Sequence, residues 1–206
     1  MFMLRETLPD LKSKIRFIHA VPGAPSVDIY SQGVLLKSNL SFGDLSEYVE
    51  LSPGDYTLDL YPSGTYATAL FSSNLTIKPN SYSTVSIVTN NSVISFFVLT
   101  DTASKASPDI SFLRFINLSP NSPLLSLSIR NRDTLFNSVE YLETTGYYPL
   151  SPGIYNFTLS FAGASVVTKT LSNVTLVPGG FETVYVIGLL DGIPDIGYIL
   201  STDGRT

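Results

Sequence analysis

The chain has 206 residues, enough for one large domain or for two domains of roughly a hundred residues that each bury a core. Only 14% of the residues are charged, the net charge is −5, and the 12 lysines and arginines are scattered, which excludes the clustered cations that nucleic-acid binding requires. The absence of cysteine excludes disulfides, thiolate metal sites and thiol nucleophiles.

Residues 1–13 are expected to be an N-terminal extension. They contain neither a basic region nor the apolar run of about 7–15 residues that a secretory signal needs. We therefore expect no signal peptide in this sequence, and no apolar stretch along the chain is long enough to predict a transmembrane segment.

A first β-rich unit is predicted over residues 14–101. Apolar and polar residues alternate with period two in Tyr56–Tyr61, so that Leu58 and Leu60 face inward while Thr57 and Asp59 face outward, as in a half-buried strand. Pro and Gly turn signals recur at intervals of roughly ten residues, and Phe42–Glu47 has room for one helical turn at most. The further predicted strands run over about 14–21, 26–31, 33–38, 47–51, 68–78, 82–89 and 93–99.

A small and polar segment over residues 102–109 is predicted to link this unit to a second copy over 110–206. The copies share collinear blocks that are about 98 to 102 residues apart. They are IRFI and LRFI beginning at residues 15 and 113, LSPGDY and LSPGIY at 51 and 150, SNLTI and SNVTL at 73 and 172, and a closing Thr-Asp at 100 and 202. The blocks indicate an internal duplication.

Seven or eight short strands in each copy, separated only by tight turns, predict an all-β chain. We expect two tandem Greek-key β-sandwich domains of immunoglobulin or transthyretin type, each with its own core.

The segments RFIHAVPGAPSVDIY over 16–30 and FGDLSEY over 42–48 resemble the bacterial family called domain of unknown function 4397. The resemblance covers nearly the whole chain, but the second copy departs from the pattern: Asn117 replaces His19, Ser126 replaces Asp28 and Ser128 replaces Tyr30. It implies a tandem domain, often exported or attached to the cell envelope, with no established activity. A cell-surface or extracellular location follows as an expectation from the resemblance alone.

His19 is the only histidine, and Asp28 is a possible partner for it. A histidine with carboxylates can act as a base or ligand. The alternatives are a buried histidine bonded to backbone groups and an aspartate that stabilises a turn.

Asp44 and Glu47 are spaced three apart, which could present two oxygens to a hard cation, although exposed loop carboxylates are usually only solvated. No nucleophile elbow, phosphate loop or dinucleotide fingerprint is present, so no catalytic residue, metal site or cofactor is assigned.

Tyrosines at predicted strand ends and loops, among them Tyr30, Tyr48, Tyr61 and Tyr66, are candidates for stacking on sugar rings or for protein contacts. The alternative is ordinary packing with a wet hydroxyl.

These features predict a non-catalytic structural or adhesive module of a bacterial cell envelope or another surface layer. Its expected partner is a polysaccharide or an envelope protein. A carbohydrate-binding module that uses loop tyrosines is the alternative, and an enzyme centred on His19 and Asp28 is a remote one.

Overall fold

The structure is a computed structural model, and it describes residues 11–102, 104, 106–163 and 168–204. In these residues all regular secondary structure is β-strand, and none of them forms a helix long and apolar enough to cross a membrane. The strands form four four-stranded sheets in two pairs, which confirms the predicted pair of β-sandwiches.

The strands of the first copy, called repeat 1 below, lie close to the ranges that the alternation predicts. They are β1 (Ser13–His19), β2 (Val27–Ser31), β3 (Val34–Leu40), β4 (Val49–Leu51), β5 (Gly54–Pro62), β6 (Phe71–Ile77), β7 (Tyr82–Asn90) and β8 (Val93–Asp101).

The second copy, repeat 2, has the same succession. Its strands are β9 (Ser111–Asn117), β10 (Leu125–Ile129), β11 (Thr134–Val139), β12 (Tyr148–Leu150), β13 (Gly153–Phe161), β14 (Thr168–Leu176), β15 (Phe181–Ile187) and β16 (Gly197–Thr202). The predicted boundaries of extension, units and linker fall partly on residues 1–10, 103, 105, 205 and 206, outside the described residues, and stay predictions.

Both repeats have one topology. In repeat 1 the sheets are ordered β4-β1-β7-β8 and β3-β2-β5-β6, and in repeat 2 they are ordered β12-β9-β15-β16 and β11-β10-β13-β14. The chain passes repeatedly between the two sheets, and the only parallel pairs among the described strands are β1 with β7 and β9 with β15. This is the crossing pattern of a Greek-key sandwich.

Each repeat buries its own apolar core between its two sheets, because alternate residues of each strand point inward. In repeat 1, Phe17, Ile29, Leu58 and Leu60 are fully buried in this core. The inward positions predicted for Leu58 and Leu60 are therefore correct.

A third apolar core lies between the repeats. It contains Ile18 and Val88 from repeat 1 and Ile116 and Tyr185 from repeat 2, all fully buried. Strands β1, β7, β9 and β15 are thus covered on both faces, which explains why their sequences are continuously buried rather than alternating.

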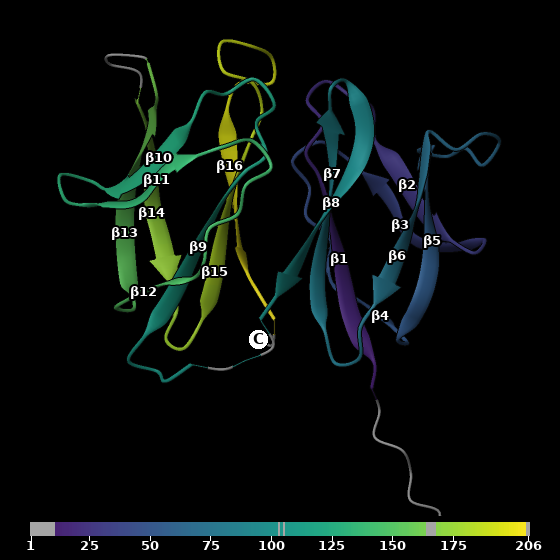
Figure 1. Cartoon of the computed structure of the whole chain (residues 1–206), viewed down its shortest axis with the longest axis horizontal. Coiled ribbons are helices and arrows are strands. Elements are labelled where there is room, and N and C mark those ends of the chain that lie inside the picture. The colour runs from purple at the N-terminus through teal and green to yellow at the C-terminus, as the bar shows by residue number, and fades with distance from the viewer. Residues whose placement is uncertain (1–10, 103, 105, 164–167, 205–206) are drawn as a thin grey trace, which may run out of the picture.

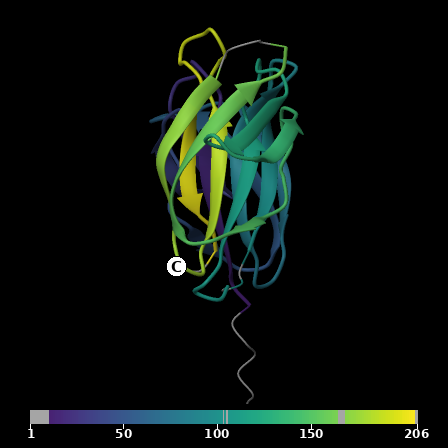
Figure 2. The ribbon, with the colours of Figure 1, turned by 90° about the vertical axis from the view of Figure 1, so that its left-hand side faces the viewer.

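The protein is consequently a stack of four sheets, visible side by side in Figure 1. The sheets β4-β1-β7-β8 and β12-β9-β15-β16 are the inner layers and face each other. The other two are the outer layers, and Figure 2 shows the stack from the outer sheet of repeat 2.

Candidate functional site

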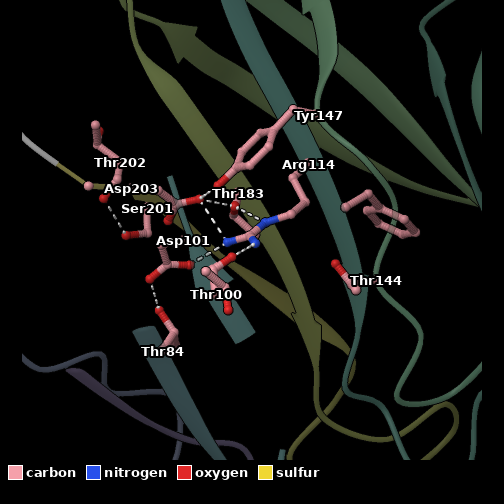
Figure 3. Close-up of polar contacts among 12 residues, drawn as sticks. Thr84, Thr100, Asp101, Arg114, Thr144, Tyr147, Thr183, Ser201, Thr202 and Asp203 are labelled. Carbon is pink, nitrogen blue, oxygen red and sulfur yellow. Dashed lines mark hydrogen bonds and ion pairs between the residues drawn. The ribbon is translucent and has the colours of Figure 1, made fainter. Parts of the chain in front are cut away.

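The largest group of buried polar side chains lies where the two inner sheets meet, and Arg114 of β9 is at its centre (Figure 3). Its Nε donates to the hydroxyl of Thr183 at 2.9 Å, and one terminal nitrogen donates to the carbonyl oxygen of Thr100 at 3.0 Å. The other terminal nitrogen donates to Asp101 at 2.5 Å and to Asp203 at 2.9 Å. Arg114 therefore binds a carboxylate from each repeat.

Arg16 of β1 occupies the matching position in repeat 1. Its Nε donates to Thr84 at 2.8 Å, just as Arg114 uses Thr183. Its terminal nitrogens donate to the hydroxyl of Ser201 at 2.5 Å, to the carbonyl of Thr202 at 2.9 Å and to the carboxylate of Asp203. Both guanidinium groups thus reach across the boundary between the repeats.

Two tyrosines cover this cluster, again one from each repeat. Tyr48 donates its hydroxyl to Asp101 at 2.8 Å, and Tyr147 donates to Asp203 at 2.7 Å. The rings lie against the guanidinium carbons of Arg16 and Arg114, with centroid distances of 4.6 and 4.7 Å. The structure therefore places Tyr48, one of the candidate ligand-binding tyrosines, in the contact between the repeats.

We call Arg16, Asp101, Arg114 and Asp203 the Arg/Asp cluster. The side chains are 4% and 5% exposed for the arginines and 0% for the aspartates, so the charges are almost fully withdrawn from water. Burial alone would lower the pKa of both guanidinium groups, but the surrounding tyrosines and carboxylates raise it, so both stay charged.

Burial acts in the opposite direction on the carboxylate of Asp203. Burial raises the pKa of Asp203, and the neighbouring charge of Asp101 adds to this, while the two guanidinium groups counteract it. Two positive and two negative charges balance, and each is hydrogen-bonded, which is the condition under which buried charges are tolerated. The cluster joins the two repeats.

His19 is committed to the backbone. The N–H of Val21 donates to its Nδ1 at 3.3 Å, and its Nε2 lies 3.1 Å from the carbonyl oxygen of Pro25, so Nε2 is the protonated nitrogen. Burial lowers the pKa of His19, which keeps the ring neutral.

Asn117, the counterpart of His19 in repeat 2, does the same work. Its Oδ1 accepts the N–H of Ser119 at 3.0 Å, and its amide nitrogen donates to Ser122 at 3.0 Å. Each side chain accepts the backbone N–H two residues later in the chain, which indicates a structural role for both residues.

Asp28 stabilises a bulge and a turn. It accepts the N–H of Asn39 at 2.7 Å, where the backbone has a positive φ of 49°, and the N–H of Gly64 at 2.9 Å. In repeat 2 the hydroxyl of Ser126 accepts the N–H of Ser138, which also has a positive φ. The hydrogen bonds of Asp28 hold its pKa below the usual range although burial opposes them. His19 and Asp28 therefore serve separate backbone contacts.

Asp44 and Glu47 are also used separately. Asp44 accepts the N–H of Ser41 at 2.9 Å, and its counterpart Glu143 accepts the N–H of Glu140 at 2.7 Å. Glu47 instead lines a polar cleft of about 630 Å³. Among the described residues, no group of three or more acidic or histidine side chains is arranged to hold a metal ion.

That cleft is lined by residues of both repeats, among them Lys14, Tyr48 and Tyr82 of repeat 1 and Ser201 of repeat 2. The ring of Tyr82 packs edge to face on Tyr48 at 5.4 Å, and the ammonium group of Lys14 lies 5.7 Å from its centre. Arg16 of the Arg/Asp cluster also lines the cleft.

The sequence brings three other tyrosines together on the outer sheet of repeat 1. Tyr30 of β2, Tyr61 of β5 and Tyr66 of the β5–β6 loop are in mutual ring contact, and we call them the tyrosine platform. Tyr66 lies 4.7 Å from both Tyr30 and Tyr61, and those two lie 5.5 Å apart. Tyr66 is 55% exposed and the other two are partly exposed.

The positions that sequence reasoning missed are the partners in the Arg/Asp cluster. Arg16 with Arg114, and the two Thr-Asp endings, were recognisable only as signs of duplication. The available signal was that polar residues recur at equivalent places inside strands that are otherwise apolar.

Comparison with known proteins adds a family. A family model described as a domain of unknown function (DUF4397) matches residues 13–128. No curated protein matches the sequence.

Two solved structures are similar at low scores. One is the Bacillus anthracis TIE protein, with 11% identity and a TM-score of 0.26, over 87% of this chain and 34% of that one, so the chain spans about a third of its length. The other is a family CBM26 module from Eubacterium rectale Amy13K in complex with maltoheptaose, with 12% identity and a TM-score of 0.27, over 91% and 96% of the two chains. Scores this low assign no function.

The family model is the informative match. It covers all eight strands of repeat 1 and continues into β10 of repeat 2, and it confirms the resemblance seen in the first repeat. The second copy rests on the internal duplication and on the identical topology of the two sandwiches. The chain belongs to the DUF4397 family.

Proposed function

We propose that this protein is a non-catalytic structural or adhesive module of a bacterial cell envelope or another outer surface layer. The observation that carries the proposal is the buried contact between the repeats. An apolar core and the Arg/Asp cluster together make the two sandwiches one body, as a load-carrying or presenting element requires.

The fate of the chemically capable residues supports the non-catalytic part. His19, Asp28 and Asp44 each satisfy backbone N–H groups, and repeat 2 does the same work with Asn117, Ser126 and Glu143. A general base needs a ring nitrogen within reach of a substrate proton, whereas both nitrogens of His19 have backbone partners.

Two observations support the location. Members of the family are often exported or attached to the envelope, and only 14% of the residues of this chain are charged. A surface rich in hydroxyl and amide groups is soluble without strong long-range fields, which suits a passive module.

Two measurements test the proposal. Fractionation of the native organism with a specific antibody should recover the protein in wall, surface-layer or medium fractions. Recovery only from the cytosol would contradict the location.

A panel of esterase, phosphatase, glycosidase and peptidase substrates should show no turnover. Turnover by the parent that is lost in His19→Asn would contradict the non-catalytic assignment. The asparagine is the residue that repeat 2 uses at this position, so loss of folding is not expected to confuse the result.

A further inference from the structure

The outer sheet of repeat 1 carries a feature that its duplicate lacks. Across the four strands, the registers align Leu35, Tyr30, Asp59 and Ser72 in one row, and Tyr61 follows Asp59 by two residues on the same face. Strand register therefore brings Tyr30 and Tyr61 close together on this face. Asp59 and Ser72 are the polar residues of the row.

The same row in repeat 2 consists of hydroxyl residues. The registers there align Thr134, Ser128, Thr158 and Thr170, and Ser160 stands at the position of Tyr61. The sheet has the same strand order in both repeats. Since repeat 2 forms the equivalent sheet without aromatic residues at these positions, the fold does not require the tyrosine platform.

The platform is also costly to leave in water. Tyr66 is 55% exposed, and Leu35, which pairs in register with Tyr30, is 46% exposed. Val34 and Leu70 are 63% and 45% exposed. All four belong to the outer sheet of repeat 1 or to its loops. Exposed apolar and aromatic side chains that the fold does not need are typical of a binding site.

The geometry of Tyr66 suits stacking. Its ring lies 4.7 Å from those of Tyr61 and Tyr30, at angles of 34° and 50°, so two neighbours pack against it while more than half of the residue stays exposed. A β-carbon added to Gly33, where φ is 80°, would lie 3.8 Å from the Tyr66 hydroxyl, so the β2–β3 turn approaches the ring closely. A ring held in this way loses little conformational entropy when a ligand binds.

The chemistry around the ring favours a neutral, hydroxyl-rich ligand. The face of an aromatic ring is electron-rich and attracts the polarised C–H groups of a pyranose ring. Asp59 provides carboxylate oxygens beside the platform, and Ser72 donates to it at 2.6 Å. Hydrogen-bond acceptors beside an aromatic face match a sugar, while a negative charge there disfavours an anionic polymer.

We propose that this face binds a neutral polysaccharide, with a pyranose ring stacked on Tyr66 and a neighbouring hydroxyl donating to Asp59. The inference rests on the adhesive role proposed above and names what the module adheres to. Only repeat 1 would then bind the polysaccharide, because repeat 2 has no equivalent of the tyrosine platform.

The test uses the full chain and a panel of neutral polysaccharides: amylose, laminarin, cellulose, chitin and xylan. The chain contains no tryptophan, so tyrosine emission reports directly on the soluble members. Insoluble members are tested by depletion from solution. At least one polymer should bind.

The decisive variants are Tyr66→Ala and the pair Tyr30→Ser with Tyr61→Ser, which installs the residues of repeat 2. Each should raise the dissociation constant by about tenfold or more, as expected for loss of a stacked ring. Tyr198→Ala, at a tyrosine of β16 that is 39% exposed, is the matched control and should bind like the parent.

Three results would overturn the inference. They are no binding to any of the five polymers, equal binding by the parent and the platform variants, and concentration-dependent self-association lost in Tyr66→Ala, which would make a second copy the occupant. Absence of polysaccharide binding in a protein recovered from the cell surface would remove this inference and leave the proposed function standing.

Discussion

Arg114→Met should be among the most damaging single substitutions in this protein. The change removes four hydrogen bonds and leaves Arg16 as the one cation of the Arg/Asp cluster beside the buried carboxylates of Asp101 and Asp203. Methionine fills much of the same volume, so the loss is electrostatic rather than a cavity.

The expected size follows from burial. Breaking a buried ion pair by removing one partner costs about 3–5 kcal/mol, because an uncompensated charge remains. Since the pKa of Asp203 is already raised, this carboxyl can take up a proton in the variant and limit the cost. We therefore expect a loss of about 3 kcal/mol in the free energy of unfolding.

The assay is urea unfolding at pH 7 followed by circular dichroism, with Lys169→Met as the matched control. The Lys169–Asp195 pair is exposed, with side chains 34% and 67% accessible, so its loss should cost less than about 1 kcal/mol. The double variant Arg114→Met/Asp203→Asn restores charge balance and should recover part of the loss. The reasoning would be refuted if Arg114→Met cost no more than Lys169→Met.

Three further outcomes are expected. Burial raises the pKa of Glu182 from 4.5 to about 7, so the folded state binds this proton more tightly than the unfolded state, and stability should fall as pH rises from 4.5 to 7. Glu182→Gln should abolish that fall and be more stable than the parent at pH 8 by up to about 3 kcal/mol in urea unfolding, and an unchanged pH profile would contradict this. His19→Asn should lower the melting temperature less than His19→Leu. The leucine leaves the N–H of Val21 without its acceptor, at a cost of about 1–3 kcal/mol. Equal melting temperatures of the two variants would argue against the role of His19 in bonding the backbone. A fragment of residues 1–105 should keep the circular dichroism spectrum of a β-sheet protein, and it should self-associate in analytical ultracentrifugation because its inner sheet is exposed. A folded monomer would contradict the claim that this face needs a covering partner.

Much of the fold could be predicted because local signals and the duplication agree. Period-two alternation placed β5, and the Pro-Gly turns bounded the strands around it, so predicted and observed strands differ by only a few residues at most ends. The inner strands were harder to predict from alternation. In the run Ile15–Ala20, one face packs in the core of repeat 1 and the other face packs in the core between the repeats.

The contact between the repeats could not be read from the sequence. Arg16 and Asp203 are 187 positions apart, and nothing local to either residue indicates its partner. The recurrence of Arg, Thr and Asp in both copies signalled duplication, but only the facing of the two inner sheets shows that each arginine binds the aspartate of the other repeat.

The candidate site was predicted in part. Tyr30, Tyr61 and Tyr66 were named individually, while their assembly depends on strand register and on the course of the β5–β6 loop. Tyr48 was grouped with them because it also follows a loop, yet its hydroxyl binds a buried aspartate of the Arg/Asp cluster. Residue type and loop position alone do not separate these two environments.

The central claim is that the two repeats form one rigid body, and a distance distribution between them tests it most directly. The chain has no cysteine, so Thr76→Cys and Thr175→Cys, at exposed equivalent positions of β6 and β14, allow clean double spin labelling. Pulsed electron paramagnetic resonance should give one narrow distance distribution, which broadens when Arg16→Met and Arg114→Met are added. A broad or multiple distribution in the labelled parent would contradict the claim.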